Sequence, residues 1–175
     1  MKNRVTPTQR EIALGEQDFI VSKTDLKGRI TYANRIFMNI SGYSEPELLG
    51  RQHNILRHPD MPRAIFKLLW DYIQAGRECF AYTKNLCKNG DHYWVLANVT
   101  PDRDEGGNIS GYFSVRRRPR DEAIRYFSDL YARMLDAERR AGPREAIAAS
   151  TALLEDEISQ KGFKDYETFV LADAL

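Results

Sequence analysis

The sequence predicts an α+β domain: a five-stranded antiparallel sheet with helices on one face, followed by a helical C-terminal extension. Three observations indicate this class. Two strand-like segments joined by a short turn open the domain, three more follow residue 78, and helical periodicity fills the stretch between the two groups and the stretch after residue 119. Because short turns join consecutive antiparallel strands, both groups can belong to one sheet. A hollow between helix and sheet is therefore expected.

The first strands and helices are read from turn and cap residues. Residues 18–33 form a hairpin of two strands around a glycine-containing turn. Asn34 then opens a short helix. Ser44, with Glu47 three positions later, forms the capping box of a second short helix over residues 44–50.

The main helix covers residues 62–76, because apolar residues recur there every three or four positions up to a glycine. The recurring residues are Ile65, Phe66, Leu69, Trp70 and Ile73. Residues 79–118 then give three strands, with turns at residues 88–91 and 104–107.

The composition changes after Pro119, where an amphipathic helix begins. Glycines and a proline separate it from two further helices, expected at residues 143–160 and 164–174. The chain thus divides into an N-terminal arm or cap at residues 1–17, a domain at residues 18–119 and a helical extension at residues 120–175.

Composition and charge exclude several classes of partner. The 26 basic and 25 acidic residues give a net charge of +1, which favours neither nucleic acid nor an acidic membrane. Cys79 and Cys87 are too few for a disulfide framework, as is typical of a reducing cytosol. The first 17 residues are polar, and no later run has the length of a membrane span. We therefore expect a soluble, cytoplasmic protein.

Five segments occur in a recognisable order: DLKGRITYAN, SGYSEPELLG, RHPDMP before the main helix, KNGDHYWV, and ISGYFSVR. Together they resemble the PAS sensor fold over roughly residues 18–120. More narrowly, NILRHPDMP and KNGDHYWV resemble the flavin-binding PAS domain of bacterial aerotaxis receptors. The resemblance implies noncovalent binding of FAD, whose oxidation state reports the redox or oxygen condition of the cell to a signalling partner.

The resemblance also implies an output route that we do not expect for this chain. In aerotaxis receptors the signal passes to a membrane anchor, a HAMP segment and a chemotaxis signalling hairpin. The tail of this chain, which ends in KGFKDYETFVLADAL, departs from that architecture. We therefore expect the output to pass to another protein or through the tail, whose apolar face would also serve a homodimer.

The segment before the main helix contains the first candidate site residues. Pro59 holds His58 in an extended conformation, and Asp60 is expected to cap the helix or to pair with Arg57. Arg57 and His58 lie together just before a helix N-terminus, where donors and the helix dipole suit an anion. By resemblance, Arg57, His58 and Asp60 all contribute to holding FAD.

The remaining cofactor candidates are two amides, Asn34 and Asn85, and three aromatic residues. Asn34 is expected either to cap its helix or to place its amide at the rim of the pocket. Phe66 is expected in the core, and Trp70 either in the core or stacked on a ring of the cofactor. Trp94 is expected to face the pocket or to contact the helical tail.

Asn85 lies on the first strand after the main helix, and its facing depends on a register that the sequence does not define. By resemblance its amide faces the edge of the isoalloxazine ring. Reduction of a flavin adds a proton at N5 and turns an acceptor into a donor. An amide has both groups and can respond by flipping.

Other functions fit fewer residues. A haem-binding PAS gas sensor needs an axial ligand, and His53 or His58 would have to serve because the main helix contains no histidine. No histidine pair has metal-ligand spacing, and His92 is expected to be an exposed turn residue. A ligand-free interaction module that dimerises through its tail is a third possibility. An enzyme is not expected, because no nucleophile-base pair or phosphate loop is present.

Overall fold

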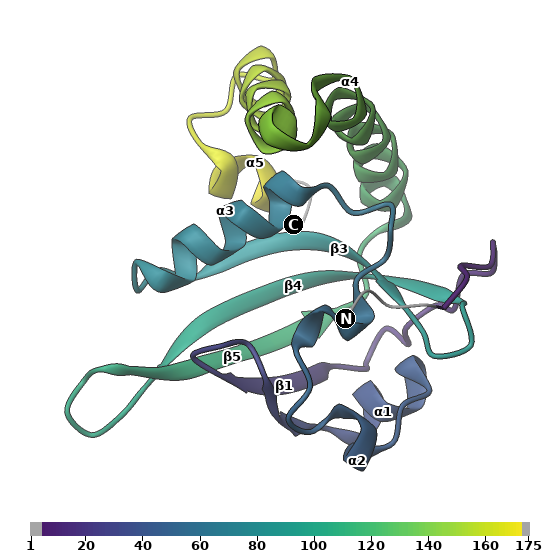
Figure 1. Ribbon diagram of the computed structural model, residues 1–175, viewed down its shortest axis with the longest axis vertical. Coiled ribbons are helices and arrows are strands. Elements are labelled where there is room, and N and C mark those ends of the chain that lie inside the picture. The colour runs from purple at the N-terminus through teal and green to yellow at the C-terminus, as the bar shows by residue number, and fades with distance from the viewer. Residues whose placement is uncertain (1–4, 173–175) are drawn as a thin grey trace.

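The computed structural model describes residues 5–172 and shows a five-stranded antiparallel sheet in the order β2-β1-β5-β4-β3 (Figure 1). The strands are β1 (Ile20–Asp25), β2 (Ile30–Ala33), β3 (Cys79–Leu86), β4 (His92–Arg103) and β5 (Ile109–Arg117). The expected fold class is confirmed: two strands, then helices, then three strands form one sheet, and a long helical extension follows.

The register of the strands defines two chemically different faces. Arg116 of β5 pairs with Ala97 of β4, and Asn85 of β3 pairs with Tyr93 of β4. Because side chains alternate along a strand and paired residues point to the same side, Arg116 and Asn85 lie on one face of the sheet. Trp94, the neighbour of Tyr93, lies on the other face.

The face with Arg116 and Asn85 is covered by the segment between β2 and β3. This segment contains α1 (Arg35–Ser41), α2 (Glu45–Leu48), the 3₁₀ helix η1 (His53–Leu56) and α3 (Arg63–Gln74). The caps predicted for α1 and α2 are present. The side chain of Asn34 accepts a hydrogen bond from the amide of Phe37 at 3.0 Å, and Ser44 and Glu47 form a capping box.

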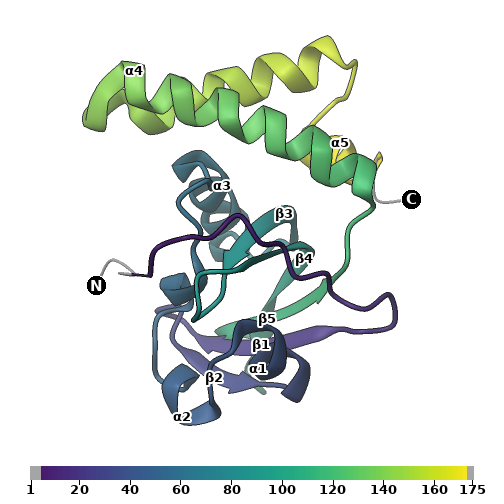
Figure 2. The same cartoon turned by 90° about the vertical axis from the view of Figure 1, so that its right-hand side faces the viewer.

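The extension contains α4 (Asp121–Gln160) and α5 (Tyr166–Ala172). As expected, α4 consists of two helices, because Gly142, with φ 78° and ψ 173° just before Pro143, is not helical. The chain folds back at this kink, so that the two arms of α4 lie side by side (Figure 2). The last residues of the helix expected at 164–174 lie outside the described residues.

Helices α4 and α5 pack on the sheet face away from the cavity described below. The ring of Phe127 in α4 stacks on Tyr82 of β3 with 4.2 Å between centroids. Tyr131 stacks on Trp94 and donates a hydrogen bond to the carbonyl of Tyr82 at 2.7 Å. The extension therefore shares a continuous apolar core with the sheet and with α3.

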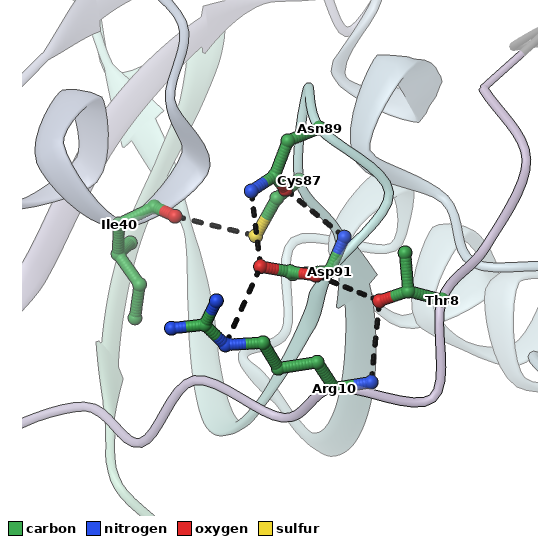
Figure 3. A network of polar contacts seen from close by, with 6 residues as sticks. All are labelled: Thr8, Arg10, Ile40, Cys87, Asn89 and Asp91. Atoms are coloured by element: carbon green, nitrogen blue, oxygen red, sulfur yellow. Dashed lines mark hydrogen bonds and ion pairs between the residues drawn. The ribbon is translucent and has the colours of Figure 1, made fainter.

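The N-terminal arm is docked on the turn between β3 and β4. The amide of Thr8 donates to the carbonyl of Gly90, and that of Ile12 to the carbonyl of His92, both at 2.7 Å. The carboxylate of Asp91 accepts hydrogen bonds from the hydroxyl of Thr8 at 2.7 Å and from the side-chain amide of Asn89 at 3.0 Å (Figure 3). The arm thus closes this end of the sheet.

The docked arm corrects the expectation for His92. Residue 92 was expected at the surface of a turn, but its side chain is 7% exposed. Both backbone groups of His92 bond to the arm, because its amide also donates to the carbonyl of Arg10 at 3.0 Å.

In the described part of the chain, no helix has the length and apolar character needed to cross a membrane.

Candidate functional site

A cavity of about 180 Å³ lies between α3 and the sheet. Its walls are mainly apolar, with polar groups contributed by the sheet and by the loops, as is typical of cofactor pockets. The loop side is open, because Gln52 and Asn54 line the cavity and are exposed to solvent. The lining residues from α3 and the sheet are Phe66, Leu69, Trp70, Ile73, Ser22, Thr24, Thr83, Asn85, Ala97, Val99, Tyr112, Ser114 and Arg116; those from the loops are Gly28, Gln52, His53, Asn54 and Arg57.

A buried arginine, Arg116, contributes a charged group to the wall of the cavity. Arg116 is 3% exposed, and its Nη2 donates to the hydroxyl of Ser22 at 2.6 Å and to Nε2 of His53 at 2.7 Å. Within the described residues its Nη1 has no hydrogen-bond partner. Burial lowers the pKa of Arg116 to about 10, so that the guanidinium is still charged at neutral pH. The cavity therefore contains a positive charge with unused donors.

The contact with Arg116 defines the protonation of His53. A guanidinium only donates hydrogen bonds, so Nε2 of His53 must accept, and its proton is assigned to Nδ1. Burial and the charge of Arg116 lower the pKa of His53 to about 3. A neutral imidazole therefore lies beside the buried cation, and it stacks on Phe37 at 5.9 Å between centroids.

Two further polar groups from the sheet face the same space. Asn85 is 8% exposed and lines the cavity, which settles the facing that its sequence left open. The hydroxyl of Ser114 also lines the cavity and has no hydrogen-bond partner among the described residues. Hydrogen-bonding capacity is thus concentrated on the sheet side, opposite the aromatic residues of α3.

Arg57 and Trp70 occupy the loop and helix walls. The guanidinium carbon of Arg57 lies 4.3 Å from the ring centre of Phe66, and its Nη2 donates to the carbonyl of Met61 at 3.4 Å. The backbone of Arg57 forms a β-bridge with Asn85, which ties this loop to β3. Trp70 meets Tyr112 edge to face at 5.5 Å.

His58 and Asp60 lie outside the cavity. His58 is 3% exposed, its Nδ1 accepts a hydrogen bond from the amide of Asp60 at 3.1 Å, and its ring packs against His92. Burial, with the nearby charge of Lys84, lowers the pKa of His58 to about 4. The carboxylate of Asp60 pairs with Lys84 at 2.7 Å.

The expectation that Asp60 caps the main helix was wrong. The N-cap residue of α3 is Pro62, two residues after Asp60. A side chain caps a helix from the N-cap position, and Asp60 does not occupy that position. Those amides bond instead to Glu138 of α4, at 2.7 Å from the amide of Arg63. Asp60 does not pair with Arg57 either, because its partner is Lys84.

Asn34 and Trp94 also lie away from the cavity. The amide of Asn34 caps α1 and also bonds to the backbone of Phe19 and Val21, at 2.8 and 3.1 Å. Trp94 contacts Tyr131 of the tail, which was one of its two expected positions. The structure therefore brings together four of the eight residues expected to bind cofactor: Arg57, Phe66, Trp70 and Asn85.

Sequence reasoning missed Arg116 and ranked His53 too low. Arg116 lies in a run of basic residues that reads as a solvated strand end. The signal that could have identified it is alternation along β5, which places Arg116 on the same face as Tyr112 and Ser114. The sequence around His53 contains no comparable signal, because its burial depends on Arg116, Ser22 and Phe37 from three other elements.

Gly28 makes the close approach of Trp70 possible, and an alanine there should be costly. Its φ is +74°, and a Cβ atom would lie 3.0 Å from the indole ring. We expect Gly28→Ala to lower the free energy of unfolding by about 1–2 kcal/mol and to displace the indole. Urea unfolding followed by tryptophan fluorescence measures both effects.

Gly50→Ala is the matched control, because Gly50 has φ +76° and nothing within 4 Å of the added Cβ. It carries the backbone cost without the contact with Trp70. Equal losses of stability in the two variants, with unchanged tryptophan fluorescence, would contradict the proposed packing of Trp70 on Gly28.

The three histidines predict a loss of stability in mild acid. Burial lowers the pKa of each one in the folded chain, to about 3 for His53 and about 4 for His58, from 6.5. As the pH falls below 6.5, the histidines of the unfolded chain become protonated while those of the folded chain stay neutral. The free energy of unfolding therefore decreases between pH 6.5 and the lower pKa values of the folded chain. Each histidine can contribute a slope of up to about 1.4 kcal/mol per pH unit.

Urea unfolding at a series of pH values from neutral to mildly acidic checks this expectation. The slope should become smaller in His53→Gln, since this side chain no longer titrates. A free energy of unfolding that stays constant down to about pH 5 would rule out the buried, neutral state of these histidines.

Comparison with known proteins places this geometry in a family. A family model described as the PAS fold matches residues 16–119. The chain is 46% identical over 124 residues to the aerotaxis receptor of Escherichia coli (strain K12), which covers 71% of this chain and 24% of the receptor. It is 32% identical over 102 residues to phototropin-2 of Oryza sativa subsp. japonica, which covers 58% of this chain and 11% of that protein. The chain thus spans a quarter or less of these two relatives.

Solved structures agree on the fold. The blue-light photoreceptor Aureochrome1 LOV in its light state superposes with a TM-score of 0.55 at 26% identity, over 67% of this chain and 90% of that one. The family model covers more than half of the 175 residues and coincides with the sheet and the helices that enclose the cavity. The chain therefore belongs to the PAS-fold family.

Proposed function

We propose that this chain is a cytoplasmic redox sensor that binds FAD noncovalently in the cavity beneath α3 and relays the state of the flavin to a signalling protein. The observation that carries the proposal is the buried Arg116, a cation with unused donors that faces a mainly apolar cavity. The 46% identity with an aerotaxis receptor supports the same function. We propose a binding module and not an enzyme.

The residues of the cavity fit an isoalloxazine ring. Its flat apolar faces suit the aromatic wall formed by Phe66, Trp70 and Tyr112. The carbonyl oxygens and ring nitrogens along its polar edge suit Nη1 of Arg116 and the hydroxyl of Ser114, neither of which has a hydrogen-bond partner in the described structure. The phosphates and adenine would lie on the open loop side, where Arg57 offers a positive charge.

Bound FAD would supply reversible electron transfer, and the chain's own residues would tune and report it. The positive charge of Arg116 in the cavity wall would favour the negative charge that reduction adds to a bound ring. The amide of Asn85 can rotate to offer either an acceptor or a donor, and so can follow a change in protonation of the ring edge. His53 stays neutral and keeps Arg116 in position.

For the four residues outside the cavity wall we propose supporting roles in cofactor binding. His58 and Asp60 order the loop that leads into α3, through the 3.1 Å contact and the ion pair with Lys84. Asn34 caps α1, and Trp94 anchors the tail on the sheet. Substitution of any of these four residues would then change FAD binding by displacing the cavity wall, and not by removing a direct contact with FAD.

The absorption spectrum of the purified protein tests the cofactor. We expect flavin bands in the visible range, and FAD in the supernatant after denaturation. A Soret band would indicate haem instead, which the geometry favours less because Nε2 of His53 is engaged with Arg116 and His58 lies outside the cavity. Absence of visible absorbance, together with no binding of added FAD, would favour an interaction module.

Arg57→Ala tests the assignment of the loop side. We expect about tenfold weaker binding of FAD and little change for riboflavin, which has no phosphate. Arg63→Ala is the control, because Arg63 is an exposed arginine in the first turn of α3 that does not line the cavity. Unchanged FAD affinity in Arg57→Ala would show that this assignment is wrong.

The partner is proposed to be a separate signalling protein. A homodimer through the tail has less support, because the apolar stripe of α4 is buried within the chain. The buried stripe consists of Ala123, Phe127, Leu130, Tyr131, Met134, Ala146, Leu154 and Ile158. A dimer would therefore use another surface or require the tail to leave the domain.

A further inference from the structure

Helix α3 forms one wall of the cavity but lacks a cap of its own. It contributes Phe66, Leu69, Trp70 and Ile73 to the lining. The first amides of a helix have no partner within the helix and need an acceptor from outside. The N-cap residue of α3 is Pro62, which has no side-chain acceptor. The position of this wall therefore depends on a group supplied by another part of the chain.

That group is the carboxylate of Glu138, near the end of the first arm of α4. Its Oε1 accepts hydrogen bonds from the amides of Arg63 at 2.7 Å and Ala64 at 3.4 Å. The same atom accepts a hydrogen bond at 2.9 Å from Ser150, which lies on the second arm. Glu138 is 8% exposed and Ser150 is fully buried, so this is a built contact and not a surface encounter.

One carboxylate oxygen thus joins three segments: the start of α3 and both arms of the α4 hairpin. The negative charge lies at the positive end of the α3 dipole, where it is favourable. The same charge acts on the cavity residue Arg57. Burial lowers the pKa of Arg57, and the negative charge of Glu138 partly opposes this shift.

The aromatic contacts between α4 and the sheet do not reach the cavity, and α5 meets α3 near its C-terminal end, where Tyr166 lies edge to face against Tyr72 with 6.4 Å between ring centroids. The aromatic residues of α4, such as Phe127 and Tyr131, pack on Tyr82 and Trp94, on the sheet face opposite the cavity. They hold the tail on the domain. The contact of Glu138 differs from them, because its partners are the first residues of the helix that carries Phe66 and Trp70.

We infer that Glu138 is a positioning residue through which the helical tail and the cavity are coupled by way of α3. When the tail is docked, the carboxylate holds the N-terminal end of α3 in place and the cavity wall with it. A ligand that displaces α3, or that neutralises Arg57, changes the docking of the tail. Because coupling between two sites is reciprocal, undocking the tail must change ligand affinity by the same factor. The ligand half of this inference rests on the function proposed above.

Amide hydrogen exchange on the whole chain, without ligand, tests the link between tail and helix. In Glu138→Gln we expect exchange at Arg63 and Ala64 to be about five- to tenfold faster than in the wild type, and the increase to continue along α3. Ser150→Ala keeps the carboxylate but removes its support, and should give a smaller increase at the same amides. Glu145→Gln is the control, because Glu145 is an exposed residue of the same helix.

Flavin binding to the same variants tests the link to the cavity. We expect Glu138→Gln to bind FAD about three- to tenfold more weakly, with Glu145→Gln unchanged. In the wild type, saturating FAD should alter exchange around Ser150, and this response should shrink in Glu138→Gln. Glu138→Asp, which keeps the charge on a shorter side chain, should recover part of the affinity.

The outcomes separate this inference from the proposed function. Wild-type exchange in α3 of Glu138→Gln would overturn the inference, whatever ligand the cavity takes. Faster exchange with wild-type FAD affinity would also overturn it, because Glu138 would then be a structural cap without coupling. If the wild type binds no FAD, the proposed function fails, while exchange along α3 in the ligand-free variants still decides whether Glu138 controls the cavity wall.

Discussion

Phe127→Ala is expected to lower the free energy of unfolding by about 3–5 kcal/mol, the largest effect on stability that we foresee for a residue of the tail. Phe127 is fully buried and stacks on Tyr82 of the sheet at 4.2 Å. Its ring also meets Tyr131 and Phe169, each at 5.7 Å between centroids. Alanine would leave a void at the point where α4, α5 and the sheet meet.

Urea unfolding measures this loss, and the slope of the transition shows whether the tail unfolds with the sheet. Phe19→Ala is the control, because Phe19 is a phenylalanine with 47% exposure; we expect a change within about 0.5 kcal/mol. A loss below about 1 kcal/mol in Phe127→Ala would mean that the tail is not part of the folded core in solution.

Arg116→Met is expected to have the largest effect on the chemistry of a bound flavin. The buried guanidinium favours the negative charge that reduction adds to the ring, so its removal should lower the potential of the one-electron couple. About 1.4 kcal/mol corresponds to about 59 mV, and a charge pair at partly buried contact distance is worth a few kcal/mol, so we expect a shift on the order of 100 mV. Spectroelectrochemical titration measures it.

A second readout of Arg116→Met needs no cofactor. The charge of Arg116 contributes, after burial, to the lowered pKa of His53, so the pKa of this histidine should rise in the variant. Titration followed by NMR shows the direction. Arg117→Met is the control, because Arg117 is exposed and, as the residue next to Arg116 on β5, points to the opposite face of the sheet. An unchanged potential in Arg116→Met would refute the role proposed for Arg116, and an unchanged His53 pKa would refute its contact with the histidine.

Local patterns were sufficient for most of the fold. Alternation and glycine-containing turns predicted the strands, and the caps of α1 and α2 follow from Asn34, Ser44 and Glu47. Apolar spacing predicted α3 and placed Phe66 and Trp70 on its inner side. These signals work because caps, turns and helical periodicity depend on residues within a few positions of one another.

The site depended on contacts that no local pattern contains. Arg116 and Ser22 are 94 positions apart in the chain, and Glu138 and Arg63 are 75 apart. A cap supplied by a distant carboxylate looks, in the sequence, like a charged residue on a surface helix. For this reason Asp60, the nearest carboxylate, was wrongly expected to cap α3.

The class of fold, the order of its elements and the family could all be predicted from the amino-acid sequence, because each of them depends on short-range patterns and motifs. The tertiary structure decided which side chains share the cavity, since a strand's facing depends on its register against strands distant in the chain. It also decided that the tail belongs to the core, because the apolar face of an amphipathic helix does not specify what covers it. Burial then lowered the pKa values of Arg116 and His53, on which the proposed function rests.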